Sequence, residues 1–120
     1  MKYDPHSHIF FEMADGSYIA FFELLDKSEP HVPVANDWAQ HLALEVEDQQ
    51  AADVLLAKLH DCGVEVVGPE HHGGMIDSWY FSDPSGHRLE IVVRTAGQDV
   101  WDKLASKAEA TLDEWQQRRV

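Results

Sequence analysis

Residues 78–90 read Ser-Trp-Tyr-Phe-Ser-Asp-Pro-Ser-Gly-His-Arg-Leu-Glu, and this stretch decides the fold. The turn signal Asp83-Pro84-Ser85-Gly86 separates two runs that are typical of β-strands. The second run carries a carboxylate, Glu90, between Leu89 and Ile91 in the middle of an apolar strand. Burying an unpaired charge is costly, so Glu90 needs a partner, and a metal ion is the leading candidate.

The residues before this hairpin predict that it completes a β-α-β-β-β unit over residues 41–94. Residues 41–46, His-Leu-Ala-Leu-Glu-Val, alternate apolar and polar side chains as a half-buried strand does. Asp48 is the expected N-cap of a helix that runs to about Cys62 and ends at Gly63. The helix has apolar residues at i, i+3, i+4 and i+7: Ala52, Leu55, Leu56 and Leu59.

Between this helix and the quoted hairpin we expect a short strand over 64–67, then a loop over 68–75. The loop contains the sequence His-His-Gly-Gly at positions 71–74. The hairpin itself is expected to have strands at about 77–82 and 87–94.

The ends of the chain add a hairpin and a helix. Residues 8–13 and 17–25 predict a β-hairpin closed by Asp15-Gly16, and residues 26–40 predict a connecting loop. This hairpin resembles the last two strands of the 41–94 unit, because each pair ends in a strand with a glutamate, Glu23 or Glu90.

After Gly97, residues 99–118 predict an amphipathic helix that packs on the domain or on a partner. The fold class is therefore α+β, with one incomplete paired-module domain over 1–97 (hairpin 1–25, complete module 41–94) and a helical segment over 98–120.

Composition limits the function. The chain has 120 residues, 44% of them hydrophobic, which suits one domain with a modest core. Its net charge of −13 argues against nucleic acid or anionic membrane as a partner. The single cysteine suits a reducing cytoplasm, and no apolar run approaches the roughly 18 residues that span a bilayer.

Strand alternation predicts that His41 and Glu90 lie on one face of the sheet. If the helix covers the aliphatic faces of both strands, these two side chains point to the other side. Two strands of one curved sheet could then bring an imidazole and a carboxylate together on one ion, such as Fe(II), Zn, Ni or Mn. The alternative is that Glu90 is an exposed residue of a one-sided sheet and His41 only begins a strand.

The ordered series 41–48, 63–69 and 79–90 resembles the vicinal-oxygen-chelate superfamily of glyoxalase I, bleomycin-resistance proteins and extradiol dioxygenases. The resemblance covers residues 6–95 and implies paired β-α-β-β-β modules whose sheets curl around a metal. It implies that His41 and Glu90 are metal ligands and that Glu23 occupies the matching place in the preceding module. The family's remaining ligand comes from a first strand that would precede residue 1, which implies a shortened first module or a site completed by another chain.

The dioxygenase branch has a local signature that this sequence nearly reproduces. The matching residues are His71 or His72, then Tyr80, the Asp83-Pro84-x-Gly86 turn and Glu90. The resemblance implies that Tyr80 and one of the two histidines assist the substrate. The alternatives are that Tyr80 only packs and that the histidines lie in a solvated loop.

The function expected from the resemblance is a metal-dependent, extradiol dioxygenase-like enzyme that uses Fe(II) and acts on an aromatic diol or similar small molecule. Zn, Ni or Mn are the other expected metals, and a homodimer is expected. The alternatives are a glyoxalase I-like lyase, a non-catalytic drug-binding protein of the bleomycin-resistance kind, and an inactive truncated homologue.

Overall fold

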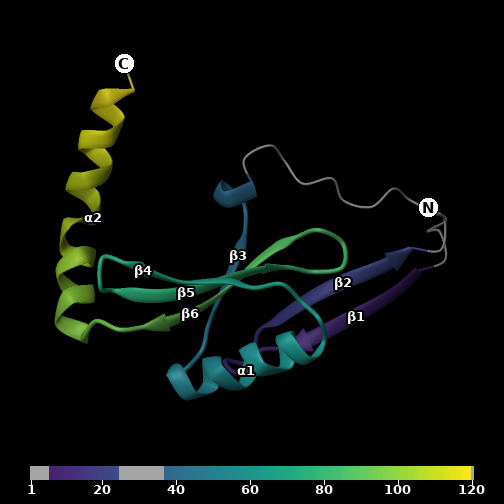
Figure 1. Ribbon diagram of the computed structural model, residues 1–120. Helices are drawn as coiled ribbons and strands as arrows, with labels where there is room; N and C mark the ends of the chain where they lie inside the picture. Colours follow the sequence, from purple (N-terminus) through teal and green to yellow (C-terminus); the bar gives the residue numbers. More distant parts are fainter. Residues whose placement is uncertain (1–5, 25–36, 120) are drawn as a thin grey trace, which may run out of the picture. The chain divides into compact units, whose positions relative to one another are not determined.

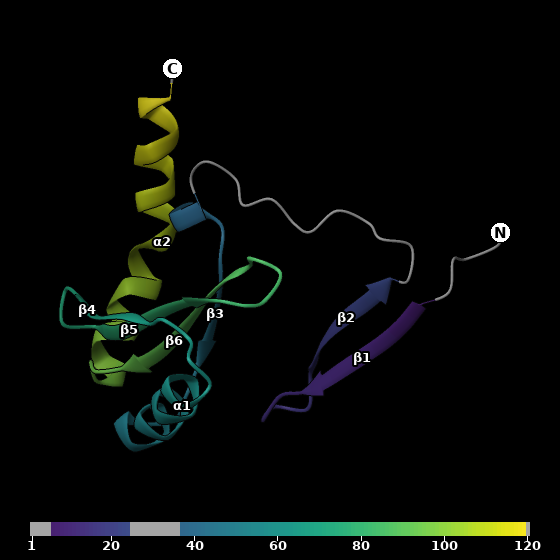
Figure 2. The same cartoon turned by 45° about the vertical axis from the view of Figure 1, so that its right-hand side comes forward.

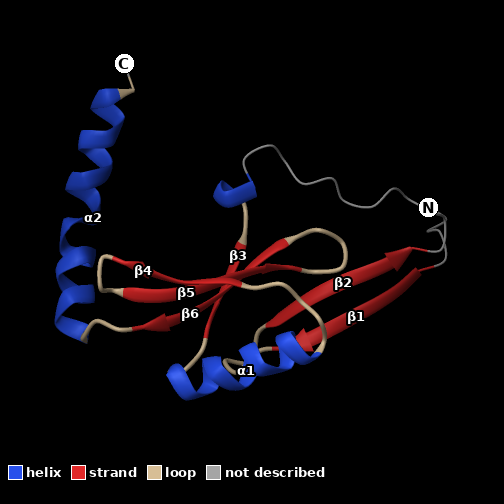
Figure 3. Cartoon of the chain, in the orientation of Figure 1, coloured by secondary structure: helices blue, strands red, loops and turns tan. Residues whose placement is uncertain are grey.

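The computed structural model describes residues 6–24 and 37–119. These residues form two compact units, divided after residue 31, and each unit is described by itself. Figure 1 labels the elements, and Figure 3 separates helices from strands. Residues 1–5 and 25 of the expected hairpin, 26–36 of the expected loop, and residue 120 lie outside the described part of the chain.

The first unit is the predicted hairpin, with β1 (His6–Glu12) antiparallel to β2 (Tyr18–Leu24). Its turn is closed by a backbone hydrogen bond from the Met13 amide to the Ser17 carbonyl and by the Asp15 carboxylate, which accepts from the Ser17 amide. Gly16 has φ of +84°, the left-handed conformation for which glycine is suited. The prediction from Asp15-Gly16 is confirmed.

The second unit contains the predicted β-α-β-β-β order. A 3-10 turn (Asp37–Ala39) leads into β3 (Leu42–Glu45), and α1 (Gln49–Asp61) follows. The sheet is completed by β4 (Val67–His72), β5 (Ile76–Ser82) and β6 (Arg88–Arg94), in the spatial order β3-β6-β5-β4. β3 is parallel to β6, and the other pairs are antiparallel. The expected α+β fold is confirmed.

The helix α1 begins and ends where the sequence predicts. The Asp48 carboxylate accepts a hydrogen bond from the Ala51 amide at 2.8 Å, which satisfies one of the unpaired amides of the first turn. At the other end Gly63 has φ of +74°, so the chain reverses there.

One face of the sheet packs against α1 (Figure 2). Ala52 of α1 is buried with Trp79 of β5 and with Ile91 and Val93 of β6. Partly buried apolar residues surround this cluster: Val46, Leu56, Leu59, Val66 and Phe81. The opposite face of β5 and β6 therefore carries the alternate residues, which include Tyr80 and Glu90.

The predicted position of the strand before this hairpin is wrong. Residues 64–66 are not in a strand, and β4 occupies Val67–His72, where a loop was expected. Gly68 and Pro69 are poor strand formers, and they fall in an irregularity of the β4–β5 pairing between Val67 and Glu70. Pairing with β5 resumes at Glu70 and makes a strand of residues whose own preference does not predict one.

The last helix, α2, spans Gln98–Arg118, against the predicted 99–118. It begins close to the end of β6 and extends away from it (Figure 1). None of its described residues is buried. No helix in the described part of the chain is long and apolar enough to cross a membrane.

Candidate metal centre

The structure brings His41 and Glu90 together on the face of the sheet opposite α1. Their atoms Nε2 and Oε2 are 2.8 Å apart. His41 directly precedes β3, and Ala43, two residues on, is level with Glu90 in the parallel β3–β6 pair. Side chains two residues apart share a face of a strand, which explains why the imidazole reaches the carboxylate.

Glu90 is a buried carboxylate with a defined partner, since it is 5% exposed and the His41 side chain is 26% exposed. The alternative of an exposed Glu90 is therefore wrong. A buried carboxylate beside an imidazole offers the mixed N/O donors that divalent metal ions accept. Two ligands bonded at about 2.1 Å to one ion lie roughly 3 Å apart, so the observed separation suits shared coordination.

Tyr80 is the third side chain of this cluster. It is level with Glu90 in the β5–β6 pair, and its ring meets the His41 ring edge-on with centroids 5.8 Å apart. Burial raises the pKa of the Tyr80 hydroxyl, and the negative charge of Glu90 raises this pKa further. The hydroxyl, protonated at neutral pH like any tyrosine, therefore stays a hydrogen-bond donor to higher pH than usual.

The two expected histidines lie on opposite faces of the sheet. His72 is on the face of Tyr80, and its Nε2 is 3.0 Å from the Tyr80 hydroxyl oxygen. His71 pairs with Asp77 across β4 and β5 and contacts the Asp77 carboxylate through Nδ1. Asp77 is level with the core residue Val93, so His71 lies on the α1 side and is not brought to the cluster.

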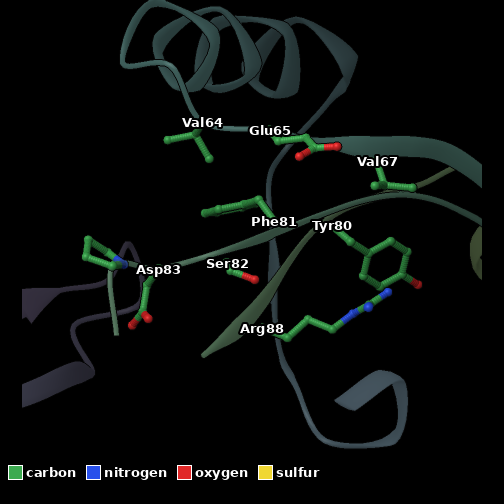
Figure 4. Close-up of a pocket in the computed structure, with 9 residues that line it drawn as sticks. Val64, Glu65, Val67, Tyr80, Phe81, Ser82, Asp83 and Arg88 are labelled. Atoms are coloured by element: carbon green, nitrogen blue, oxygen red, sulfur yellow. The ribbon is translucent and has the colours of Figure 1, made fainter. Parts of the chain in front are cut away.

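The sequence analysis assigned no role to Arg88, although it lies two residues before Glu90 on β6 and so shares its face. Its guanidinium carbon is 4.6 Å from the centroid of the Tyr80 ring, a cation–π contact. Figure 4 shows the Arg88 side chain beside the Tyr80 ring, with Phe81 pointing away from them. The same alternation that selected Glu90 could have indicated Arg88.

A cavity of about 540 Å³ lies beside Tyr80 and Arg88 (Figure 4). Its other walls come from the segment before β4 and from the turn after β5: Val64, Glu65, Val67, Phe81, Ser82, Asp83 and Pro84. His41 and Glu90 do not line it. The cavity is therefore a neighbour of the His41–Glu90 pair rather than the pair's own pocket.

Glu23 lies on β2 in the other unit, level with Ser7 of β1. Alternation places it on one face of the hairpin with Ile9 and Phe21, while His6 and His8 are on the opposite face. Across residues 6–24 and 37–119, no three or more His, Cys, Asp or Glu side chains are grouped so that they could hold a metal ion. The ligand roles of His41, Glu90 and Glu23 remain predictions.

Comparisons with known proteins agree with this fold. The model of the family described as "Glyoxalase/Bleomycin resistance protein/Dioxygenase superfamily" matches residues 2–91. A curated relative, metallothiol transferase FosB of Bacillus licheniformis, is 37% identical over 78 residues, which cover 64% of this chain and 48% of the relative. This chain thus spans about half the length of that relative.

A similar solved structure is the integron cassette protein HFX_CASS4 from the mobile metagenome of the Halifax Harbour sewage outfall. It is 27% identical in sequence and matches with a TM-score of 0.50. The match covers 70% of this chain and 66% of that chain.

Proposed function

This chain belongs to the glyoxalase/bleomycin resistance protein/dioxygenase superfamily, and from that premise we propose that it is part of a divalent-metal-dependent enzyme that acts on a small molecule. His41 and Glu90 would hold the ion. The observation that carries the proposal is the 2.8 Å contact between the imidazole and a carboxylate that is almost fully buried. When bound, the metal would supply Lewis acidity and a template for two neighbouring substrate oxygens.

Transfer of a thiol to a metal-activated electrophile is the first reaction class we propose. It is supported by the 37% identity to a metallothiol transferase over a segment of 78 residues. This chemistry involves no change in the oxidation state of the metal, so Zn, Ni and Mn are as suitable as Fe(II).

Tyr80 would serve this reaction as a donor to a substrate oxygen. Its hydroxyl is protonated at neutral pH, as is usual for tyrosine, and burial and the charge of Glu90 raise its pKa further. The His72 side chain, which shares a hydrogen bond with that hydroxyl, is 42% exposed. The pair therefore connects a buried proton donor with solvent, which a general acid needs in order to be recharged.

Extradiol ring cleavage of an aromatic diol with Fe(II) is the second candidate. The observation that favours it is the hydrogen bond between Tyr80 and His72 beside the His41–Glu90 pair, because the dioxygenase-like signature in the sequence predicts a role for these two side chains together. In this case Tyr80 and His72 would orient the diol oxygens by hydrogen bonding.

Metal titration of the full chain tests the shared part of both candidates. We expect isothermal titration calorimetry to detect one site for at least one of Fe(II) (kept anaerobic), Zn, Ni and Mn. His41→Ala and Glu90→Ala should abolish it. His60→Ala is the matched control, because the His60 side chain is 90% exposed on α1. Wild-type protein that binds none of the four metals would refute the proposal and favour a metal-free binding module.

A substrate panel then separates the reactions. We expect the protein to consume a low-molecular-weight thiol only when both a metal ion and an electrophile with two neighbouring oxygens are present. Ring opening of a catechol by the Fe(II)-loaded protein, without thiol consumption, would reverse the order of the two candidates. Isomerisation of the methylglyoxal–glutathione adduct would contradict both and indicate a glyoxalase I-like enzyme.

A further inference from the structure

The helix α2 carries an apolar stripe that its own unit leaves open. Leu104 is 42% exposed, Leu112 is 55% exposed and Trp115 is 58% exposed. Only the start of the helix is partly covered, where the Arg94 guanidinium lies 4.6 Å from the centroid of the Trp101 ring. A helix with large exposed apolar residues along one stripe is typical of an element with a partner.

The stripe is symmetric about Ala108. Residues 101–115 read Trp-Asp-Lys-Leu-Ala-Ser-Lys-Ala-Glu-Ala-Thr-Leu-Asp-Glu-Trp. Trp101 and Trp115 are each seven residues from Ala108, and Leu104 and Leu112 are each four residues from it. At 100° per residue all five lie within roughly 40° of one line along the helix. Reversing the helix end for end about Ala108 therefore superimposes the stripe on itself.

We propose that this stripe is an interface with a second copy of the chain, in which the two α2 helices pair antiparallel around a two-fold axis at Ala108. Such an interface is isologous, so each Trp101 would be level with the partner's Trp115 and each Leu104 with the partner's Leu112. The small residue at the axis lets the two helices approach closely, and the larger residues fill the space toward the ends.

The helix dipoles favour the antiparallel direction. Each helix carries a partial positive charge at its amino-terminal end and a partial negative charge at its carboxyl-terminal end. In an antiparallel pair centred on Ala108, Arg118 in the last turn is level with the first turn of the partner helix, so the opposite ends of the two dipoles lie side by side. A parallel pair would place the like ends of the two dipoles together.

Cysteine cross-linking tests this geometry. Helices that pack 8–10 Å apart bring two Cα atoms at the axis to about 4–5 Å, within the range of a disulfide. In a Cys62→Ser background, which removes the exposed native thiol, Ala108→Cys should form a disulfide-linked dimer in high yield under mild oxidation. Ala110→Cys is the matched control, because residue 110 lies about 160° around the helix from residue 108, and it should remain monomeric on a non-reducing gel.

Sedimentation equilibrium supplies the second measurement. We expect the wild-type chain to be a dimer and the double variant Leu104→Lys, Leu112→Lys to dissociate with a dissociation constant raised by more than about 100-fold, since four buried leucines per dimer are replaced. Circular dichroism should show that α2 is still helical, because lysine is a good helix former. A monomeric wild-type chain, a dimer that survives the double variant, or equal cross-linking through positions 108 and 110 would each overturn the proposal.

Discussion

Replacing Glu90 by glutamine tests the candidate metal centre most directly, because it removes one charge and keeps the shape of the side chain. Glu90 is 5% exposed and contacts His41 at 2.8 Å. In the metal-free protein the amide can still form a hydrogen bond with His41, so we expect the free energy of unfolding to change by no more than about 1 kcal/mol. The metal-dependent part of the stability should change much more.

The size of that change follows from linkage. A ligand at 100 times its dissociation constant stabilises the folded state by about 2.7 kcal/mol, which raises the melting temperature of a small domain by roughly 10–20 °C. Loss of a group that only supports a metal ligand weakens binding about 10–100-fold, so loss of the ligand charge itself should cost at least 100-fold. At the same metal concentration the variant would then gain only about 0.4 kcal/mol.

The assay is thermal unfolding followed by circular dichroism, with and without metal at 100 times the wild-type dissociation constant. Glu45→Gln is the matched control, since the Glu45 side chain is 52% exposed and pairs with Arg94 at the surface. This control should keep the full metal-induced rise. A Glu90→Gln protein that gains as much stability from the metal as the wild-type protein would refute the assignment of Glu90 as a ligand.

Three further substitutions test other parts of the structure. The pKa of Tyr80 is raised above its usual value of 10.0, so the stability that its protonated form contributes is present below about pH 10 and is lost as pH rises through the higher folded-state pKa. Above pH 10 the Tyr80→Phe variant should therefore lose less stability than the wild-type protein. Denaturant titrations at several pH values test this, with Tyr18→Phe at an exposed tyrosine as the control. Gly68→Ala should destabilise the fold by about 2 kcal/mol or more in urea unfolding, because φ is +137° and a Cβ atom would lie 2.6 Å from a backbone oxygen. Gly73→Ala, with open space around residue 73, should cost about 1 kcal/mol. Equal costs for the two variants would contradict this account. If Glu23 is a metal ligand, Glu23→Gln should lose most of the metal-induced rise in melting temperature, and an unchanged rise would exclude it.

Local signals were sufficient for the elements that depend on local chemistry. Asp48 and Gly63 define the ends of α1 through a side-chain cap and a left-handed glycine, and both are visible in the sequence. The Asp15-Gly16 turn defines the first hairpin in the same way. Each depends on a few adjacent residues, so no distant contact has to be known.

The approach of His41 to Glu90 was also predictable, although 49 positions separate the two residues. The alternation within each strand assigns both side chains to the face opposite α1, and the antiparallel run β4-β5-β6 that follows α1 brings β6 beside β3 and parallel to it. The sequence pattern therefore indicates the face of the sheet on which each side chain lies, and the topology makes the two strands neighbours. Both are needed for the imidazole of His41 to meet the carboxylate of Glu90.

Strand β4 could not be predicted in the same way, because its letters do not favour a strand. Gly68 and Pro69 disfavour the sheet, and the register resumes only through contacts of residues 70–72 with β5. When the position of such a strand is predicted with an error of a few residues, the face of the sheet on which each side chain lies cannot be assigned. This is why His71 and His72 could not be distinguished from the sequence, although only His72 reaches Tyr80.

The number of protein ligands is the point on which the candidate site depends. His41 and Glu90 supply two donors, and a metal site in a protein ordinarily uses three or more. The hairpin carries possible donors on both faces, with Glu23 on one and His6 and His8 on the other. Because strand side chains alternate, an ion that binds Glu23 cannot also bind the two histidines of the same hairpin. The acidic face and the histidine face of the hairpin therefore suit different ions. A carboxylate such as that of Glu23 suits harder ions such as Mn, and imidazoles such as those of His6 and His8 suit Zn, Ni and Fe(II).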